Sequence, residues 1–482
     1  MADIINLSYS TGIYIDKLKI SKIIPIYKEK GDILLTKNFR PISLLSNINK
    51  IFEKLMHKRL YDFLEKQGFI FENQFGFRKR HSTTHALIDL TEDIRQAIDK
   101  NQFSCGVFID LQKAFDTVDH GILLKKLDHY GIRGVANDWF RSYLNNRKQY
   151  VSISGFNSLL QNIDYGVPQG SVLGPLLFLI YINDLHQAIK YSKTRHFADD
   201  TNLLINNNSL KQLKKYLNID LKQLCKWLKA NKITLNCSKT EYMVFRHPNK
   251  PLNYDLKLKI NGKKLVPSKC VKYLGVVLDP HLNWSFHVDG LATKLTRAAG
   301  MLSKIRHYVP QHTLRSIYFG IFASLLTYAS QVWGQFCNKH VRRLQIIQNK
   351  AIRIINFSKF RDSVEPLYHT SKILKLTDYV NLQNFFYVHN SLSGNLPLPL
   401  KNSFQMSVDT YAYNTRAAAC QYKIVLPKVR TQNYGLFSVR YRSAALWNEI
   451  VDKFPGEKFH LQSIKVCKEK ITKFFIDGYD KH

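Results

Sequence analysis

The chain has 482 residues and a hydrophobic content of 45%, which supports roughly two to four domains with sizeable cores and excludes a disordered basic tail. Lys and Arg number 71 against 36 Asp and Glu, so the formal net charge is +35. An excess of this size over the whole length favours a nucleic-acid partner, because counterion release rewards each phosphate contact; a merely basic protein is the alternative.

The first third of the chain is predicted to alternate between strands and helices. A strand over 20–27, a turn over 28–32 and an extended piece over 38–42 predict a hairpin that brings together four basic residues, Lys28, Lys30, Lys37 and Arg40. Apolar residues at helical spacing predict helices over 47–66 and 82–99. A buried strand over 103–110 then ends in Asp110.

The middle of the chain continues this alternation. The predicted helices lie at 119–130, 136–145, 174–189 and 209–230. The predicted strands lie at 150–154, 240–245, 256–260 and 271–277, and residues 195–206 are expected to form a strand, an acidic turn and a second strand. A glycine-containing loop spans Gly166–Gly174.

Beyond about residue 285 the pattern becomes helical. The segment 339–355 predicts an amphipathic helix whose basic face either is simply solvated or tracks a phosphate backbone. A stretch rich in Pro, Asn and Ser at 391–405 predicts a linker. No repeat of fixed period is visible, which argues against a solenoid.

Cysteine usage and apolar stretches bear on the cellular compartment. The seven cysteines are scattered without a Cys-x-x-Cys pair, which argues against a disulfide framework and a zinc finger. No signal-peptide pattern stands at the N-terminus, and the longest apolar stretches, near 172–182 and 318–329, are too short to span a bilayer. We therefore expect an intracellular protein, nuclear or cytoplasmic, without a membrane segment.

Three aspartates form the most informative pattern. Asp110 ends an apolar strand, and Asp199 and Asp200 occupy a predicted hairpin turn. Carboxylates on neighbouring strands are typical ligands for a pair of Mg²⁺ ions, as nucleotidyl transfer to a 3′-hydroxyl requires. An isolated Asp-Asp in a turn is a weak signal, because turns favour Asp for local hydrogen bonds. We expect Asp116 and Asp119 to serve local structure, such as capping the helix that begins near 119.

These aspartates belong to an ordered set of motifs that resembles the reverse transcriptases of non-LTR retrotransposons, especially the jockey-type elements. The set consists of Asn38 to Leu44, Gln74 to Arg78, Phe108 to His120, Gly166 to Pro175, Phe197 to Asp200, Leu235 to Thr240 and Tyr273 to Gly275. The resemblance covers about residues 20–285 and is looser from there to about residue 450.

The resemblance implies an α+β fold of the right-hand polymerase type. This fold has fingers, a palm with an antiparallel sheet and a helical thumb, followed here by a mostly helical C-terminal region. The implied domains are fingers with part of the palm at 1–105, palm with inserted fingers elements at 106–285, thumb at 286–355, and a C-terminal region of unknown role at 356–482.

The resemblance also implies site residues. Asp110, Asp199 and Asp200 match the family's metal-binding aspartates, which hold two Mg²⁺ ions that Mn²⁺ can replace. Lys28 or Lys30, together with Arg40, would lie over the incoming triphosphate, and contact with the template backbone is the alternative.

Further roles follow from the other motifs. Phe115 matches an aromatic that blocks a ribose 2′-hydroxyl, with a buried core Phe as the alternative. Gln169 and Gly170 match the loop that touches the template–primer. Lys239 matches a general acid for the leaving pyrophosphate, although it is equally compatible with a surface lysine. Tyr273-Leu274-Gly275 resembles the primer-grip hairpin.

We therefore predict an RNA-directed DNA polymerase that uses an RNA template, a DNA primer and dNTPs. The alternatives are a nucleic-acid-binding remnant without catalysis, and an RNA-dependent RNA polymerase, which Phe115 disfavours. The predicted fingers begin about 20 residues into the chain, so we expect no endonuclease domain and a truncated copy or a fragment of a longer reading frame. No ribonuclease H acidic set is recognisable in the C-terminal part.

Overall fold

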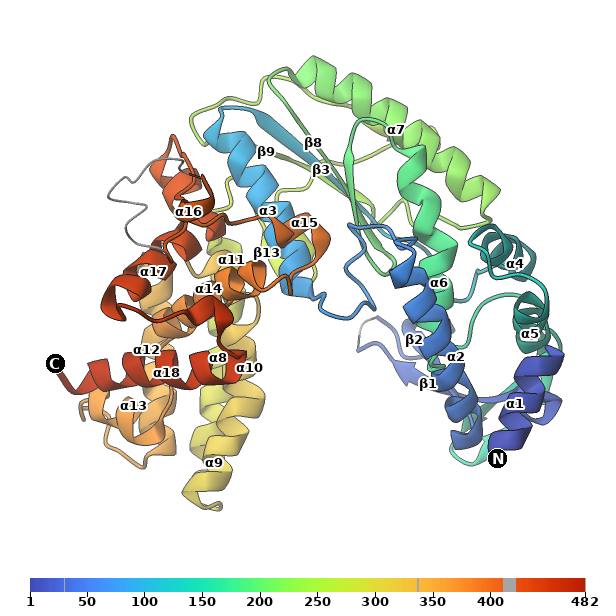
Figure 1. The fold of residues 1–482 in the computed structure, drawn as a ribbon, viewed down its shortest axis with the longest axis horizontal. Coiled ribbons are helices and arrows are strands. Elements are labelled where there is room, and N and C mark those ends of the chain that lie inside the picture. The colour runs from blue at the N-terminus through green and yellow to red at the C-terminus, as the bar shows by residue number, and fades with distance from the viewer. Residues whose placement is uncertain (30, 336–337, 411–421, 482) are drawn as a thin grey trace.

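The computed structural model describes residues 1–29, 31–335, 338–410 and 422–481. The α+β class and the right-hand polymerase architecture predicted from the sequence are confirmed. Figure 1 shows an arch: a four-stranded sheet and helix α7 form its top, the N-terminal elements form one side, and the helices after residue 285 form the other.

The four-stranded palm sheet is antiparallel throughout and has the order β7-β8-β3-β9. Its strands are β3 (Phe103–Ile109), β7 (Lys193–Phe197), β8 (Asp200–Asn207) and β9 (Glu241–Phe245). Every residue of β3 is buried, as expected for the apolar strand predicted there. Because side chains alternate along a strand, β3 must contribute to a core on each side of the sheet.

The two faces of the sheet indeed belong to two hydrophobic cores. Cys105 and Val107 join a core that includes helices α6 and α7, whereas Phe108 joins a second core that includes α3 and α8. The helices of the N-terminal half are α1 (Ala2–Thr11), α2 (Asn47–Lys66), α3 (Thr83–Asp99), α4 (His120–His129), α5 (Val135–Leu144), α6 (Gly174–Ile182) and α7 (Leu210–Ala230). Short 3₁₀ turns lie at Asp16–Leu18, Thr36–Asn38 and Asn183–Ala188.

The fingers are built on a second sheet, in which β1 pairs antiparallel with β2 and parallel with β4. Its strands are β1 (Ile20–Tyr27), β2 (Phe39–Leu44), β4 (Arg147–Ile153), β5 (Phe156–Asn157) and β6 (Gln161–Ile163). Helix α2 begins where predicted because the Ser46 hydroxyl accepts a hydrogen bond from the Asn49 N–H. Asp119 caps α4 in the same way, through the Ile122 N–H, as the sequence predicted.

Two small hairpins connect the palm to the helical part. They are formed by β10 (Lys259–Ile260) with β11 (Lys263–Lys264), and by β12 (Val271–Tyr273) with β13 (Val276–Leu278). The prediction of one strand over 271–277 was therefore wrong. Leu274 and Gly275 both adopt positive φ, at 44° and 82°, and reverse the chain between the two short strands.

The remaining elements are helical, as predicted. They are α8 (Ser285–Ile305), α9 (Gln311–Ile317), α10 (Ser324–Thr327), α11 (Ser330–Trp333), α12 (Asn338–Ile355), α13 (Glu365–Ser371), α14 (Leu376–Leu392), α15 (Leu398–Lys401), α16 (Ser407–Thr410), α17 (Val439–Lys453) and α18 (Ile464–Asp477). π-Helical turns lie at Tyr318–Ala323 and Gln432–Leu436, and 3₁₀ turns at Phe459–Leu461 and Gly478–Lys481. Along the described ranges, no helix combines the length and apolar character needed to cross a bilayer.

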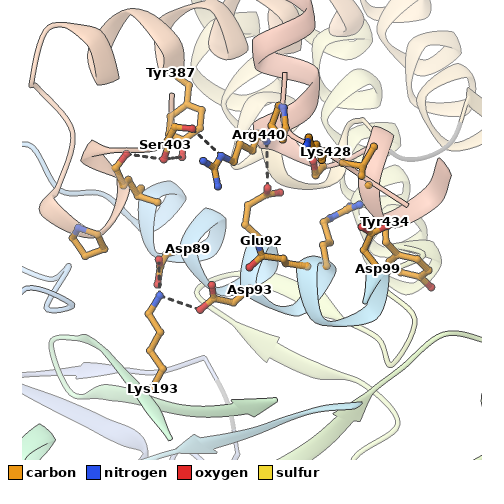
Figure 2. A pocket seen from close by; sticks show the side chains of 18 residues that line it. Asp89, Glu92, Asp93, Asp99, Lys193, Tyr387, Ser403, Lys428, Tyr434 and Arg440 are labelled. Atoms are coloured by element: carbon orange, nitrogen blue, oxygen red, sulfur yellow. Dashed lines mark hydrogen bonds and ion pairs between the residues drawn. The ribbon is translucent and has the colours of Figure 1, made fainter. Parts of the chain in front are cut away.

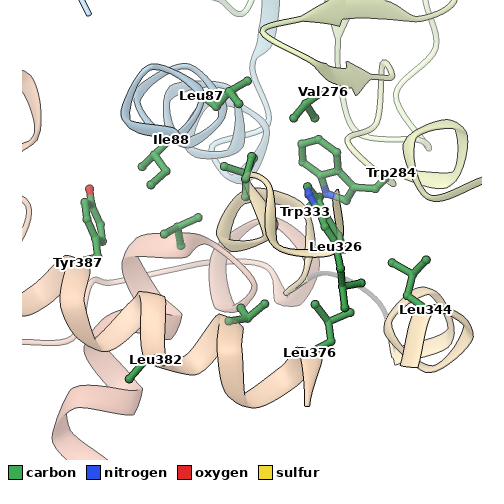
Figure 3. Close-up of a cluster of buried hydrophobic side chains, with 14 of the residues drawn as sticks. Leu87, Ile88, Val276, Trp284, Leu326, Trp333, Leu344, Leu376, Leu382 and Tyr387 are labelled. Atoms are coloured by element: carbon green, nitrogen blue, oxygen red, sulfur yellow. The ribbon is translucent and has the colours of Figure 1, made fainter. Parts of the chain in front are cut away.

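One hydrophobic core joins these helices to the palm. Figure 3 shows Leu87 and Ile88 of α3 near Val276 of β13 and near Trp284 and Trp333. Side chains from α10, α12 and α14 complete the same cluster, which continues to the C-terminal helices. This core includes residues on both sides of positions 285 and 355. The domain boundaries expected there remain predictions.

The predicted linker at 391–405 is instead packed. Leu396, Leu400 and Phe404 are each no more than 7% exposed and belong to the large core. The Ser391 hydroxyl also donates a hydrogen bond to the Lys401 carbonyl at 2.9 Å, which closes the segment on itself. The content of Pro, Asn and Ser predicted a linker, although apolar residues stand at positions 396, 400 and 404.

Helix α3 also binds the C-terminal region through polar contacts. The Glu92 carboxylate accepts hydrogen bonds from the Val439 and Arg440 N–H groups at the start of α17, at 2.8 and 3.3 Å. Asp99 accepts from the backbone N–H groups of Arg430 and Thr431. Figure 2 shows the pocket between these elements, with α3 carrying Asp89, Glu92, Asp93 and Asp99 along one side. The carboxylates thus satisfy backbone donors that would otherwise be unpaired at this contact.

The Ser443 to Asn448 segment is part of this C-terminal packing. Trp447 is fully buried and stacks on Phe385 with ring centroids 4.9 Å apart. The Asn448 side chain exchanges two hydrogen bonds with the backbone of Ile424, at 2.8 and 2.9 Å. Both residues therefore fix α17 within the region rather than forming a surface site.

Substitution Trp447→Ala should lower the free energy of unfolding by about 3–5 kcal/mol, because it leaves a large cavity beside Phe385 and Phe459. Urea unfolding followed by far-UV circular dichroism measures this loss. The matched control is Leu461→Ala, whose side chain is 72% exposed and whose removal should change stability little. Equal stability of the two variants would contradict the packing role of Trp447.

Candidate active site

Three carboxylates converge at one end of the palm sheet. Asp110 directly follows β3, Asp199 lies in the turn between β7 and β8, and Asp200 is the first residue of β8. Strands β3 and β8 are hydrogen-bonded neighbours in which Ile109 lies opposite Thr201. One step further along the same register, Asp110 therefore comes opposite Asp200.

The charges of these carboxylates act on one another. Loss of hydration and the charges of Asp199 and Asp110 together raise the pKa of Asp200 to about 6. Loss of hydration and the charge of Asp110 also raise the pKa of Asp199. Like charges held this close disfavour ionisation, and a cation bound among them would reverse that effect.

Asp110 is held by the loop between α7 and β9. The Asn236 side-chain amide donates a hydrogen bond to Asp110 Oδ2 at 2.7 Å, and the Asn236 N–H donates to the Asp110 carbonyl at 2.9 Å. Lys239 Nζ lies 3.8 Å from the same Oδ2, with its side chain 70% exposed. Lys239 is therefore an exposed ion-pair partner of Asp110, and its general-acid role stays a prediction.

The turn that carries Asp199 and Asp200 is held from the other side by residues 74–76. The Gln74 side-chain oxygen accepts hydrogen bonds from the N–H groups of Gly76 and Ala198, at 2.9 and 3.1 Å. The Phe75 N–H donates to the His196 carbonyl at 2.7 Å. A Cβ at position 76 would lie 2.3 Å from the Ala198 nitrogen, so only glycine permits this approach.

The donor chemistry at this end of the sheet fits a hard divalent cation with an open coordination sphere. Mg²⁺ prefers oxygen ligands and usually takes one or two carboxylates, with water and substrate phosphates completing its shell. Within the described ranges, no three His, Cys, Asp or Glu side chains close around a single ion position. The Oδ2 atom of Asp110 already accepts the Asn236 amide, so this carboxylate has one engaged oxygen.

Phe115 lies five residues after Asp110 and is only half-buried. Its ring stacks on Phe178 of α6 with centroids 4.7 Å apart and meets Phe77 edge-on at 6.2 Å. Two aromatic neighbours thus fix the orientation of the ring while part of it stays accessible. This arrangement is compatible with the predicted contact to a nucleotide sugar, which stays a prediction.

The loop that contains Gln169 and Gly170 is fixed between the fingers and the segment after Phe115. The Gln169 side-chain amide donates a hydrogen bond to Asp116 Oδ1 at 2.8 Å, and the backbone carbonyl of Gln169 accepts one from the Ser43 N–H of β2 at 2.7 Å. Gly170 has φ 123°, and a Cβ there would lie 2.6 Å from the Ser43 oxygen. Both predicted loop residues therefore lie where the palm meets strand β2.

The predicted fingers residues are placed unequally. Lys28 is exposed, and its ammonium donates a hydrogen bond to the Lys37 carbonyl at 2.8 Å. Loss of hydration raises the pKa of Asp116, and the charge of Lys28 is among the effects that oppose this rise. Arg40 is exposed on β2, opposite Ile26 of β1. Lys30 lies outside the described residues.

Glu53 was not predicted as a supporting residue, and it connects three elements near the site. Its fully buried carboxylate accepts hydrogen bonds from the Asn49 amide at 2.9 Å, the Tyr143 hydroxyl at 2.7 Å and the Val172 N–H at 2.6 Å. It thereby ties helix α2 to the end of the loop that contains Gln169. A glutamate in an amphipathic helix reads as a surface residue, so the sequence carried no signal for this role.

Gln74 and Asn236 were also missed as supporting residues, although both lie in motifs that carried the family resemblance. Their side chains act through hydrogen bonds to Ala198 and Asp110, which lie 124 and 126 positions away in the sequence. The only signal in the sequence was that both polar residues lie within motifs of the family. It could not reveal which partner each side chain meets.

Comparison with known proteins gives a consistent result. A family model described as "Reverse transcriptase (RNA-dependent DNA polymerase)" matches residues 26–278, more than half of the chain. The "Probable RNA-directed DNA polymerase from transposon X-element" of Drosophila melanogaster is 31% identical over 73% of this chain and 39% of its own length. The "RNA-directed DNA polymerase from mobile element jockey" of the same species is 28% identical over 80% of this chain and 42% of its own length.

The chain thus spans about two fifths of the length of these curated relatives. Among solved structures, a telomerase from Candida tropicalis in complex with a telomeric RNA fragment superimposes with a TM-score of 0.41 and 12% identity. That match covers 79% of this chain and 65% of the telomerase, and the superposition is too loose to support an argument.

Substitution Asp200→Asn should make the protein more stable than wild type at pH 7 and change its stability little at pH 4. The pKa of Asp200 is about 6 in the folded chain and near 3.8 without these neighbours, so the folded state binds the proton more tightly. The contribution of Asp200 to stability therefore falls as pH rises from about 4 to 6. Because its side chain is exposed, solvent screening keeps the effect small.

Urea midpoints of both proteins at pH 4 and pH 7 measure this difference. The matched control is Asp138→Asn on the exposed surface of α5, which should show no comparable gain at pH 7. A wild type that gains stability relative to Asp200→Asn between pH 4 and pH 7 would contradict the inferred repulsion.

Proposed function

The chain belongs to the reverse transcriptase (RNA-dependent DNA polymerase) family, and on this basis we propose that it is itself an RNA-directed DNA polymerase of a non-LTR retrotransposon. It would extend a DNA primer along an RNA template with dNTPs. The observation that carries the proposal is the convergence of Asp110, Asp199 and Asp200 at the end of adjacent palm strands. The proposal concerns this chain alone, which spans about two fifths of its curated relatives.

The three aspartates would hold the divalent ions, Mg²⁺ or in its place Mn²⁺. When bound, such a pair of ions lowers the pKa of the attacking 3′-hydroxyl and neutralises charge on the leaving pyrophosphate. Asn236 would keep one oxygen of Asp110 engaged and so fix the direction of the other. Gln74 would keep the turn with Asp199 and Asp200 in register with Asp110.

The remaining site residues would act on the nucleotide. Lys28 or Lys30, with Arg40, would neutralise the triphosphate, because guanidinium and ammonium groups form charge-assisted hydrogen bonds with phosphate oxygens. Lys239 would donate a proton to the pyrophosphate as it leaves. The support for this role is its ammonium group 3.8 Å from Asp110, on an exposed side chain.

Recognition of the template and the sugar would come from the palm loop and the gate residue. Gln169 and Gly170 would touch the nascent base pair, supported by their position between β2 and Asp116. The ring of Phe115 would exclude a ribose 2′-hydroxyl and so select dNTPs over NTPs. An intracellular location, nuclear or cytoplasmic, belongs to the same proposal.

A nucleic-acid-binding remnant without catalysis is the second candidate. It is favoured by the limited share of the curated relatives that the chain spans, and the net charge of +35 suits either function. Primer extension and template–primer binding, measured on the same preparation, separate the two. Binding without extension would identify the remnant.

Substitution Asp199→Ala should reduce primer extension on an RNA template by at least roughly a hundredfold, because it removes a ligand that positions charge in the transition state. Template–primer binding should remain, since it depends on contacts spread over the molecule. Extension is measured with dNTPs and Mg²⁺, and binding is measured by filter retention. The exposed control Asp128→Ala should retain activity. Unchanged extension by the Asp199 variant would overturn the catalytic assignment.

Substitution Phe115→Ala should lower the preference for dNTPs over NTPs by roughly tenfold or more, because removal of the ring leaves room for a 2′-hydroxyl. The ratio of kcat/KM for matched dNTP and NTP pairs measures this preference directly. Phe360→Ala removes a ring that is 80% exposed and should leave the ratio unchanged. A Phe115 variant with full dNTP preference would show that the ring serves only to pack against Phe178.

A further inference from the structure

The outer face of helix α7 carries a row of lysines that no role described so far uses. The row consists of Lys211, Lys215, Lys222, Lys226 and Lys229, all exposed and spaced by one or two helical turns. Between residues 206 and 230 the only carboxylate is Asp220. Asp220 is fully buried and accepts hydrogen bonds from the N–H groups of residues 190–192, so it cannot neutralise the row.

The packing of α7 fixes this face outward. Its apolar stripe is buried in the core on one side of the palm sheet and consists of Leu213, Leu217, Leu221, Leu224 and Leu228. Figure 1 shows α7 along the outside of the arch. The exposed lysines lie on the side of α7 opposite its buried leucines and therefore face outward from the arch.

Repulsion among these lysines lowers the stability of the folded chain when no anionic partner is bound. Like charges three or four residues apart on a helix destabilise it by a few tenths of a kcal/mol per pair, roughly. Among the described side chains, none of the five lysines forms an ion pair. By contrast, the basic face of α12 is partly neutralised, since Arg343 forms an ion pair with Asp289.

The hairpin β10–β11 extends the basic surface beside the middle of α7. The Lys259 N–H donates to the Asn218 side-chain oxygen of α7 at 3.1 Å, which fixes the hairpin against the helix. Lys257, Lys259 and Lys263 are exposed there, while Lys264 pairs with Asp255 at 3.3 Å. Lys257, Lys259 and Lys263 therefore add exposed positive charge next to α7.

We propose that this lysine face, made of α7 and β10–β11, binds the phosphate backbone of an RNA strand outside the template–primer site. Lys211 and Lys229 are 18 residue steps apart, which rise about 27 Å along the helix, and four steps rise about 6 Å, so the row offers a linear series of charges. A nucleic acid supplies phosphates in a matching linear series, and each contact releases counterions.

An anionic membrane is a poorer fit for the same charges. A helix that lies on a membrane inserts its apolar face between the lipids, whereas the apolar face of α7 is buried against the palm sheet. Exposed large apolar side chains are absent from α7. The recognition chemistry of the lysine face is thus charge alone, which favours the sequence-independent binding of a polyanion.

The test compares two triple variants of the whole chain. One is Lys215→Gln with Lys222→Gln and Lys226→Gln on α7; the control is Lys465→Gln with Lys468→Gln and Lys473→Gln on the exposed face of α18. Binding of a 40-nucleotide RNA is measured at several salt concentrations, with the active site filled by a saturating short template–primer duplex. This readout needs no catalysis, so it stands apart from the proposed polymerase activity.

The α7 variant should bind the RNA roughly tenfold more weakly at about 0.15 M salt, with the control within about twofold of wild type. The slope of log K against log salt should fall by about two for three lost contacts to a single strand. Equal losses in both variants would show that the net charge acts diffusely and would overturn the proposal. Binding of phosphatidylserine vesicles but not of RNA would overturn it as well.

Protection of the lysines from acetylation gives a second readout on the unmodified protein. RNA should protect Lys215, Lys222 and Lys226 while leaving Lys465, Lys468 and Lys473 reactive, as measured by mass spectrometry. This experiment decides the question even when the α7 variant fails to fold. Absence of protection at α7, with protection elsewhere, would overturn the proposal.

Discussion

Repulsion among three carboxylates is the constraint on which the rest of the structure depends. Asp110, Asp199 and Asp200 would separate if their backbones were free, because each raises the cost of ionising another. The palm sheet prevents this by hydrogen-bonding β3 to β8 over its whole length, and Gln74 and Asn236 hold the two ends of the arrangement. A preorganised cluster of negative charge is what a divalent cation requires of a protein.

The same sheet also joins the two halves of the molecule. One face contributes to the core of the fingers and the inner side of α7, and the other contributes to the core that continues through α8, α14 and α17. The loop that contains Gln169 meets the fingers at Ser43 of β2 and also contacts Asp116. Hydrogen bonds of 2.7 and 2.8 Å thus connect β2 to the segment after Phe115. The parts that would meet the nucleotide are therefore fixed to the scaffold that holds the aspartates.

The local elements could be read from the sequence to a large extent, because they follow from periodicity and capping. The strand over 20–27 and the helix over 47–66 have the predicted bounds, and Asp119 caps α4 as expected. Long-range contacts were not readable in this way. The buried Glu53 and the packed segment 391–405 depend on partners distant in the sequence. The reversal within the strand predicted at 271–277 was indicated only by the family resemblance of Tyr273 to Gly275, because the left-handed conformation of Leu274 is rare for a non-glycine residue.

Helix α3 contacts both the palm and the C-terminal region, and this determines where the chain can be shortened. It begins just after the segment that supports the turn with Asp199 and Asp200, and its side chains Glu92 and Asp99 accept hydrogen bonds from backbone groups of the C-terminal region. A shortened chain ending near residue 355 would leave Glu92 without those donors and would expose apolar side chains such as Leu87 and Ile88 to water. The last quarter of the chain is thus a covering layer of the palm, and a chain made without it would need another surface to replace that cover.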